Sequence, residues 1–497
     1  MWLLIVFMLY LIGLAAIGAY CTRLNRTLAD FVLGGRRMGV WVTAISAQAS
    51  DMSAWLLIGL PATAYATGLS VAWAVIGCAA GTVFNWVVIA PRLRRASEAT
   101  GALTIPDYLA ARYGEGPLRL VRVVSVLVIL LAYATYIASQ FMAAGKIFET
   151  TFGHIETPWG TVGLGYHSGM LVGVGIILLY TTMGGFTAVA WTDLAQGLLM
   201  VLTVVVLPVV GLVGLGGLAV MWDELGAAAP SLLTVSEGKG GLAFVMGVCV
   251  AGLSWGLGYP GQPHILVRFM ALRDPKRMWR AAVIGIVWVV LAMTGAVFVG
   301  LVGRAMVADL ADTDHVMPAL AVRLMHPAVV GLMIAGAVAA MMSTVDSQLL
   351  VAASAVEEDI YIRLLGGRAR QRRAVWIGRF AVLGLGAAAL PIAWNRESVF
   401  QTVFDAWGVL AAGLGPVVIL GLLTRRTNAW GAVAGIVVGL VVAQFWPWVK
   451  PAFGGDRFFV NGLVPGFVLN LVLAYVVSLV TGRARSDGAC NLQNSPD

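Results

Sequence analysis

The chain has 497 residues, of which 60% are hydrophobic and only 11% are charged. Soluble domains carry about 25% charged residues, so this composition indicates a protein that lies in lipid. The loops between its hydrophobic stretches are short, so no soluble domain is expected. The net charge of +8 indicates membrane orientation rather than nucleic-acid binding, because Lys and Arg collect in loops on one side of a membrane.

The hydrophobic pattern predicts thirteen membrane-spanning helices of about 20 residues each. The predicted spans are 2–20, 38–65, 71–91, 121–145, 169–188, 189–215, 241–258, 279–303, 328–352, 376–394, 403–424, 427–446 and 463–481. The first span is not a cleaved signal peptide, because its positive charges follow it. The expected fold class is therefore an all-α integral membrane protein.

The second and seventh spans are interrupted by small and polar residues, at 47–55 and 255–263. They lie five spans apart, so they cross the bilayer in opposite directions. Paired interruptions in two inverted halves mark the midplane binding site of a secondary transporter. A broken helix frees carbonyls for a cation and amides for an anionic substrate, provided that protein lines the cavity.

This pattern predicts two inverted five-helix repeats with additional helices on either side. The parts are an extra N-terminal helix and loop at 1–37, a first repeat at 38–215, a second repeat at 241–424, two C-terminal helices at 427–481 and a tail at 482–497. The loops expected on one side hold 24 Lys and Arg residues and the opposite loops hold seven. An external N-terminus and a cytoplasmic C-terminus follow. A short helix is expected within the Gly- and Thr-rich stretch 146–168.

Two acidic residues of the first repeat lie within predicted spans, where a charge costs about 3 kcal/mol. Asp51, inside the first interruption, either organises a cation site or caps the second half of the broken helix, and the two roles are compatible. Asp193 begins the sixth predicted span. It is either an N-cap at the membrane interface or a ligand that points inward.

Three aromatic residues accompany the interruptions: Tyr136 in the fourth span, and Trp255 and Tyr259 in the second interruption. Aromatic residues in membrane proteins usually pack or form interfacial belts. Trp255 and Tyr259, however, flank Gly256 and Gly258, where the main chain can approach a ligand closely. Large apolar faces with a polar tip suit a small amphipathic solute.

The ninth predicted span carries a polar cluster in an otherwise apolar helix: Ser343, Thr344, Asp346 and Ser347. Helical spacing puts residues 343, 346 and 347 on one face. Hard oxygen ligands suit a small hard cation such as Na⁺, as they suit Ca²⁺ and Mg²⁺. Hydroxyl groups also join membrane helices by hydrogen bonds, which is the favoured alternative for Ser343 alone. The neighbouring Asp346 favours ion binding.

Six motifs are distributed over almost the whole chain: Asp30–Arg36, Ala49–Ser53, Leu103–Tyr108, Trp191–Asp193, Trp255–Tyr259 and Gly261–His264. In these motifs the sequence resembles the sodium/solute symporter family, and within it the bacterial sodium/proline symporters. The resemblance implies a LeuT-like core of two inverted repeats with one extra N-terminal span. It also implies a transporter of the bacterial inner membrane that uses Na⁺, rather than an enzyme.

The resemblance also assigns residues by motif position. The sodium ligands would be the carbonyls of Ala49, Met52 and Ala340 and the hydroxyls of Ser343 and Thr344. Positions linked to sodium dependence are matched by Arg36, Asp51 and Ser53. The substrate side is matched by Tyr136, Trp255, Tyr259 and Pro263, with Ser53, Ala54 and Trp55 near the substrate carboxylate. A second cation site, present in some relatives, is matched by Asp193, Ser343, Asp346 and Ser347.

The sequence departs from the sodium/proline pattern at three positions. Ala54 stands where those symporters have Gly, and Pro260 stands where they have Phe, both at the substrate end. Asp346 replaces a small polar residue, so a second site for sodium or a proton would hold two carboxylates.

The expected function is sodium-coupled import of L-proline by alternating access. The first alternative is the same mechanism with another small amino acid or a monocarboxylate. The less favoured one is a membrane-embedded enzyme or sensor, for which the chain shows neither a nucleophile–base set nor a cytoplasmic domain. The expected partners are a small-molecule substrate and the lipid bilayer, with neither nucleic acid nor an obligatory protein partner.

Overall fold

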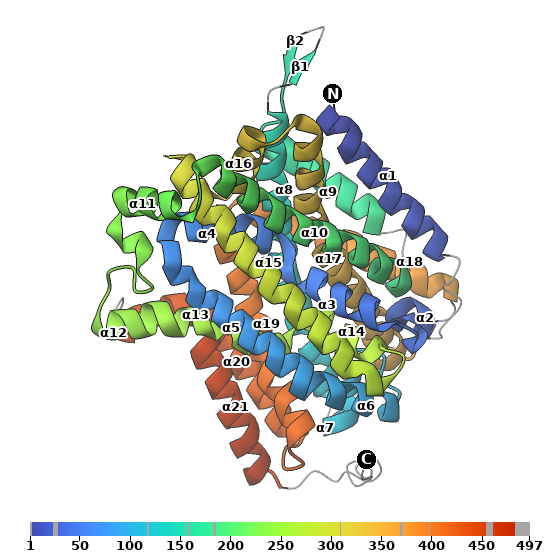
Figure 1. Cartoon of the computed structure of the whole chain (residues 1–497). Coiled ribbons are helices and arrows are strands. Elements are labelled where there is room, and N and C mark those ends of the chain that lie inside the picture. The colour runs from blue at the N-terminus through green and yellow to red at the C-terminus, as the bar shows by residue number, and fades with distance from the viewer. Residues whose placement is uncertain are drawn as a thin grey trace.

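The computed structural model describes residues 2–22, 28–116, 119–153, 155–157, 160–181, 185–308, 310–367, 371–396, 398–453 and 461–482. The predicted tail therefore lies outside the described residues from position 483 onward. Helices dominate the molecule (Figure 1).

Up to residue 228 the helices and strands are α1 (Trp2–Thr22), α2 (Leu28–Leu33), η1 (Gly34–Arg36), α3 (Val40–Ala54), η2 (Trp55–Gly59), α4 (Leu60–Thr67), η3 (Gly68–Val71), α5 (Ala72–Phe84), η4 (Asn85–Ile89), α6 (Ala90–Thr100), α7 (Ile105–Tyr113), α8 (Leu120–Phe152), β1 (Ile155–Thr157), β2 (Gly160–Val162), α9 (Tyr166–Thr181), α10 (Phe186–Leu215) and α11 (Leu218–Ala228).

The elements that follow are η6 (Pro230–Leu233), α12 (Gly241–Phe244), η7 (Val245–Val250), α13 (Ala251–Leu253), η8 (Ser254–Gly261), α14 (Pro263–Ala271), η9 (Pro275–Arg277), α15 (Met278–Met306), η10 (Thr313–His315), α16 (Val316–Leu324), α17 (Pro327–Ser354), η11 (Ala355–Leu364), α18 (Gln371–Trp394), α19 (Val399–Leu423), α20 (Ala429–Val449), η12 (Lys450–Phe453) and α21 (Leu463–Val480).

The described residues contain 11 stretches that are long and apolar enough to cross a membrane. One of them, Val40–Thr100, has 61 residues, which is enough for two crossings at 1.5 Å per residue. The shorter apolar helix Tyr166–Leu179 is α9, the fifth predicted span. If the 61-residue stretch is counted as two crossings and α9 is added, the 11 stretches of the described residues account for all thirteen predicted spans.

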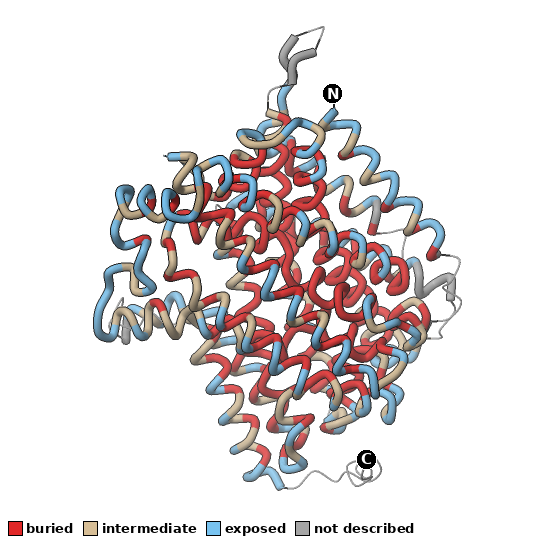
Figure 2. Tube along the Cα trace, in the orientation of Figure 1, coloured by how far each residue is buried: buried red, intermediate tan, exposed pale blue. Residues whose placement is uncertain are grey.

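The outside of the bundle is suited to lipid. Buried residues fill the centre of the molecule and exposed residues follow its periphery (Figure 2). Large apolar side chains are exposed on the outer helices, for example Leu9 of α1, Val213 of α10 and Val480 of α21. The additional helices cover the core from two sides: α1 packs on α17 and α10, whereas α20 and α21 pack on each other and on α19.

The two ends of the bundle are distinct. At the hairpin end, the strands β1 and β2 pair antiparallel, and Lys146 near the end of α8 contacts Asp314 of η10 at 2.6 Å. At the opposite end, which we call the C-terminal end, α7 and the start of α8 meet the end of η11. The short helix expected in 146–168 is wrong, because α8 continues to Phe152 and a two-stranded hairpin follows.

Three arginines that sequence analysis counted among loop charges are buried instead. Arg94 is 2% exposed, Arg122 is 3% exposed and Arg268 is 1% exposed. Arg94 donates to the carbonyl of Leu272 at 2.6 Å, and Arg122 pairs with Asp107 at 3.0 Å. These residues join helices within the protein, so only part of the positive charge on this side is available to the membrane surface.

Candidate functional site

The first predicted interruption is a break in the helix at Ser53. This residue has φ 43° and ψ −168°, a left-handed backbone conformation that is costly for a side chain other than glycine. The amide of Ala54 after the break donates to the side-chain oxygen of Gln140 in α8 at 2.8 Å. The amide of Trp55 donates to the hydroxyl of Ser53 at 3.3 Å. The capping alternative for Asp51 is therefore wrong, because Gln140 and Ser53 accept these two amides instead.

The second predicted interruption is the 3₁₀ segment η8, followed by the extended residue Gln262 and by α14. Pro263 is the first residue of α14, where the missing N–H of proline costs nothing. Tyr133 of α8 accepts the amide of His264 at 3.1 Å, and its hydroxyl also lies 3.2 Å from Nδ1 of that histidine. Both breaks are thus held by polar side chains of α8.

The glycines of η8 contact protein rather than open space. A Cβ atom on Gly258 would lie 1.8 Å from Nε1 of Trp407, and one on Gly256 would lie 2.3 Å from the carbonyl oxygen of Gly77. Such separations are impossible for real atoms, so glycine is required at both positions. These two glycines therefore allow α5 and α19 to approach η8, and the approach of a ligand to the same main chain stays a prediction.

The predicted aromatic residues lie inside the protein beside the two breaks. Trp55 and Trp255 have ring centroids 4.7 Å apart, although 200 residues separate them. The ring of Trp255 also stacks on Phe400 at 5.3 Å and on Phe404 at 4.7 Å, both from α19. The indole nitrogens of both tryptophans are buried without a hydrogen-bond partner among the described residues.

Tyr136 and Tyr259 complete the group of predicted substrate-side aromatics. The hydroxyl of Tyr136 is 3.5 Å from the carbonyl oxygen of Asp51, next to the first break. Tyr259 packs edge-on against Trp407 with centroids 5.1 Å apart. Both side chains are at most 1% exposed, so they face neighbouring helices rather than lipid.

A cavity of about 470 Å³ lies on the hairpin side of Trp255. Its walls come from α4, from the segment around η7, and from α19, α20 and α21. Trp255 and Phe404 contribute aromatic surface, whereas Glu237, Asp405 and Lys450 contribute charge. The cavity therefore adjoins Trp255 of the second break and has room for a small polar solute.

Oxygen atoms from both repeats meet beside the first break. The hydroxyl of Ser343 in α17 donates to the carbonyl of Ala49 at 2.9 Å and to that of Ala340 at 3.1 Å. The hydroxyl of Thr344 donates to the carbonyl of Ser50 at 3.0 Å. Four of the five predicted sodium-binding residues thus lie together, with the carbonyl of Ser50 as a further neighbour.

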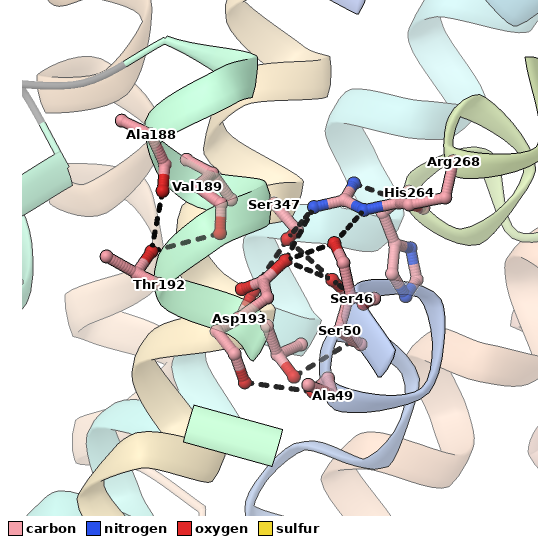
Figure 3. A network of polar contacts seen from close by, with 12 residues as sticks. Ser46, Ala49, Ser50, Ala188, Val189, Thr192, Asp193, His264, Arg268 and Ser347 are labelled. Atoms are coloured by element: carbon pink, nitrogen blue, oxygen red, sulfur yellow. Dashed lines mark hydrogen bonds and ion pairs between the residues drawn. The ribbon is translucent and has the colours of Figure 1, made fainter. Parts of the chain in front are cut away.

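A second polar group lies one helical turn further along these helices (Figure 3). The carboxylate of Asp193 accepts from Ser46 at 2.6 Å, from Ser50 at 3.1 Å and from Arg268 at 3.2 Å. The guanidinium of Arg268 also donates to Ser46 at 3.2 Å and to the hydroxyl of Ser347. Gly185 is the N-cap residue of α10 and Asp193 is fully buried, so the interfacial-cap alternative for this aspartate is wrong.

Asp346 has surroundings of its own. One carboxylate oxygen accepts from the hydroxyl of Thr181 in α9, and the other has no partner among the described residues. Its hydrogen-bond partner differs from those of Asp193, and Ser347 rather than Asp346 contacts Arg268. A buried carboxylate without a cationic partner is costly in a membrane protein.

Arg36 lies at the C-terminal end, where it joins three segments. It donates to the carbonyls of Met270 at 3.0 Å, Ser97 at 2.9 Å and Ala102 at 2.8 Å. Burial, and then the charge of Arg94, lowers the pKa of Arg36 to about 10, which leaves it positively charged at neutral pH. Its contacts fix the ends of α6 and α14 relative to η1.

Several residues of the site were not predicted from the sequence. Gln140, Tyr133 and Trp407 are single polar or aromatic residues in apolar helices, and no motif surrounds them. Arg268 carried a signal, because it follows His264 by four residues and so lies on the same face of a helix. The charge count nevertheless placed it in a loop.

The chain was compared with known proteins. The family model described as the sodium:solute symporter family matches residues 31–439. The high-affinity proline transporter PutP of Bacillus subtilis is 38% identical over 471 residues, which cover 94% of this chain and 95% of the relative. A sodium/proline symporter of Staphylococcus aureus (strain NCTC 8325 / PS 47) is 37% identical over 484 residues, which cover 95% and 91% of the two chains.

Solved structures agree in fold. A Na⁺-coupled sialic acid symporter, solved in a substrate-bound outward-open state, matches with a TM-score of 0.80 and 19% identity over 98% of this chain and 99% of its own. MhsT in complex with L-phenylalanine matches with a TM-score of 0.53 and 13% identity over 88% and 97% of the chains. The predicted LeuT-like fold class is confirmed.

Proposed function

This chain belongs to the sodium:solute symporter family, and on that basis we propose that it imports L-proline together with Na⁺ by alternating access. It is a transporter rather than an enzyme. The names of the relatives support proline as the solute. We also propose the bacterial inner membrane as its location, with the N-terminus outside and the C-terminus in the cytoplasm, because positive loops favour the cytoplasmic side.

The observation that carries the proposal is the contact of Ser343 with Ala49. It joins α17 of the second proposed repeat to the broken helix of the first. A hydroxyl that donates to a carbonyl can rotate and present its own lone pairs. Ser343 and Thr344 with the carbonyls of Ala49, Met52 and Ala340 would then offer the all-oxygen surroundings that a small hard cation prefers.

The proposed substrate site lies between the two breaks. Its members are Ser53, Ala54, Trp55, Tyr136, Trp255, Tyr259 and Pro263. The unpartnered indole nitrogens of the two tryptophans support a polar ligand there, because buried N–H groups are rarely left without an acceptor. A proline ring would pack on the aromatic faces. The cavity on the hairpin side of Trp255 would serve as its route of entry.

Sodium and substrate act on each other through the shared first break. If each prefers the closed arrangement of the broken helices, each raises the affinity of the other by the same factor. Asp51 and Arg36 are proposed to support this coupling, the first from inside the break and the second from the C-terminal end. Asp193, Asp346 and Ser347 remain a candidate second cation or proton site.

Purified protein in proteoliposomes tests the function. Counterflow of labelled L-proline should require sodium, and unlabelled proline should compete better than a panel of other amino acids, monocarboxylates and a sugar. Equal exchange of proline and sugar, or exchange that ignores sodium, would contradict the proposal.

A second candidate function keeps the mechanism and changes the solute. Ala54 and Pro260 depart from the pattern of the sodium/proline symporters at the substrate end, and both are buried. An added methyl group beside the substrate carboxylate and a lost aromatic ring would favour a differently shaped small amino acid or a monocarboxylate. The same panel separates these outcomes.

A further inference from the structure

The cavity of about 470 Å³ beside Trp255 extends beyond the proposed substrate site. Among the described residues that line it, Trp255 is the only one that also belongs to that site. The lining carries charges of both signs, because Glu237 and Asp405 are acidic and Lys450 is basic. These residues come from the connection between η6 and α12, from α19 and from the start of η12. The volume lies in the range of cavities that bind small molecules.

Glu237 has a strained main chain and a fixed side chain. Its φ is 54°, a left-handed conformation that is costly for a residue other than glycine. Its carboxylate accepts from the hydroxyl of Ser70 at 2.8 Å and from Nζ of Lys239 at 2.5 Å. Strain of this kind persists only where the surroundings fix the residue, so the position of this carboxylate at the cavity is determined by the fold.

The connection that carries Glu237 packs closely on the end of α4 and the start of α5. The indole nitrogen of Trp73 donates to the carbonyl of Val235 at 3.1 Å. A Cβ atom on Gly68 would lie 2.1 Å from the carbonyl oxygen of Leu232, so glycine is required there. These contacts hold Glu237 against the half of the first broken helix that follows Ser53.

The opposite walls are also attached to the core. The side-chain amide of Asn461, just before α21, donates to the hydroxyl of Ser254 in η8 at 3.2 Å. Lys450, at the end of α20, lines the same cavity. Asp405 pairs with Arg396 at 2.7 Å, but the two side chains are 38% and 42% exposed. Exposed pairs are weak, and a carboxylate can accept several donors, so Asp405 is able to accept a ligand as well.

The uncharged part of the lining is largely aromatic. Trp255 stacks on Phe404 with centroids 4.7 Å apart, and both rings line the cavity together with Trp446. Aromatic faces attract an ammonium group and pack on an apolar ring. A sugar would leave both kinds of charge without a partner, and a monocarboxylate would leave the acidic side chains without one. The lining therefore favours a small zwitterion with an apolar side chain.

We propose that this cavity is a second binding site, which holds a zwitterionic amino acid before it reaches the site between the two breaks. Glu237 and Asp405 bind its ammonium group and Lys450 binds its carboxylate. None of the proposed sodium ligands is among the described residues that line the cavity, so binding here needs no sodium. This inference rests on the proposed function, since it assigns an outer site to the same solute, and it favours an amino acid over a monocarboxylate.

Protection of a cysteine from labelling tests the proposal. The four native cysteines are replaced by serine, and T67C places a thiol in the lining of the cavity. Labelling by a maleimide is measured in purified protein without sodium, because binding between the two breaks is proposed to require sodium. L-Proline should slow the labelling. Cyclopentanecarboxylate, which has a ring of the same size and a carboxylate but no ammonium group, should not.

Substitutions at the charged residues locate the site. E237Q and K450Q, each combined with T67C, should raise the concentration of L-proline that gives half protection about tenfold, which is about 1.4 kcal/mol of binding free energy. E224Q and K276Q are matched controls, because they remove exposed charges outside the lining, and they should leave protection unchanged. Melting temperatures show whether each variant is folded, and the comparison of the two solutes needs no variant at either charge.

Two results would overturn the proposal. The first is equal protection of T67C by L-proline and cyclopentanecarboxylate, and the second is undiminished protection by L-proline in either E237Q or K450Q. In proteoliposomes the same two variants should show a raised KM for uptake at an unchanged maximal rate, because the outer site binds the solute without taking part in the transport step.

The T67C protein also distinguishes failure of the inference from failure of the function. If it shows no sodium-stimulated uptake of L-proline and neither does the parent protein, the proposed function is contradicted. If uptake is intact but L-proline does not protect the cysteine without sodium, only the second binding site is contradicted.

Discussion

The hydroxyl of Ser343 lies 2.9 Å from the carbonyl oxygen of Ala49, although 294 residues separate them in the chain. The contact exists because α3 breaks at Ser53 and so leaves carbonyls without helical partners. A continuous helix would have used these oxygens internally. The break in one repeat and the hydroxyls of the other therefore create together a group of oxygens that neither possesses alone.

Replacing both Ser343 and Thr344 by alanine should abolish the stimulation of uptake by sodium. Each hydroxyl is a proposed sodium ligand. The loss of one hydroxyl should lower the affinity for sodium about tenfold, which is about 1.4 kcal/mol of binding free energy. Initial uptake rates over a sodium series measure this effect. Ser354→Ala is the control, because among the described residues its hydroxyl donates to the carbonyl of Leu350 in its own helix. A double variant with unchanged sodium dependence would remove both residues from the site.

Gln140 should be required as the acceptor for the broken helix. Gln140→Leu leaves the buried amide of Ala54 without a partner, which costs about 1–3 kcal/mol. We expect a lower melting temperature and weaker substrate binding. Gln140→Glu keeps an acceptor at the same place and should bind substrate better than the leucine variant, as measured by uptake and thermal unfolding. Equal binding by the two variants would contradict this role.

Trp255→Ala should impair substrate binding, because it removes the ring that separates Trp55 from the aromatic residues of α19. Removing a packed aromatic ring also costs about 3–5 kcal/mol of folding stability. Trp255→Phe retains a smaller ring, so its substrate binding and its stability should both be impaired less. Trp279→Ala is a matched control, since that tryptophan is 62% exposed on α15. A wild-type concentration dependence of uptake in Trp255→Ala would exclude this residue from the site.

The ion pairs of Lys146 should stabilise the hairpin end. The Nζ atom contacts Asp314 at 2.6 Å, where both side chains are buried, and Asp312 at 2.7 Å, which is 40% exposed. Asp314→Asn should therefore lower the melting temperature more than Asp312→Asn. Similar losses in the two variants would show that burial does not decide the strength of these pairs.

The same ion pairs should make stability depend on pH. Burial by itself raises the pKa of Asp312. The hydrogen bonds from Lys146 and from the amide of Asp314, together with the charges of Lys146 and His315, outweigh it and hold the pKa below the ordinary value of 3.8. A carboxylate whose folded pKa is depressed stabilises the fold above its unfolded pKa and loses this contribution as pH falls through the folded one. The melting temperature of the parent protein should therefore fall below about pH 4, and this part of the fall should be absent in Asp312→Asn.

The sequence predicted those features of the site that depend on local chemistry. The small and polar residues at 47–55 and the glycines and prolines at 255–263 interrupt two apolar stretches, so both interruptions were predicted, whereas the exact break at Ser53 was not. Features that depend on how distant helices cross were not predicted. Gly258 faces Trp407, and Arg268 faces Asp193, and nothing near either residue in the chain announces its partner. The hairpin at 155–162 was missed because Gly and Thr are compatible with several loop structures.

Asp346→Ser provides the last test, because it replaces the carboxylate by the small polar residue that the resemblance to sodium/proline symporters predicts at this position. Asp346 is fully buried, and one of its carboxylate oxygens has no hydrogen-bond partner among the described residues. Its charge therefore has to be balanced by a cation or a proton. If sodium balances it, uptake should depend on sodium with a Hill coefficient above one that falls to one in the variant. If a proton balances it, the variant should instead lose a pH dependence of uptake at constant sodium.

Asp346→Glu keeps the carboxylate and should retain whichever dependence the parent shows. Wild-type responses of Asp346→Ser to both sodium and pH would end the idea of a second site.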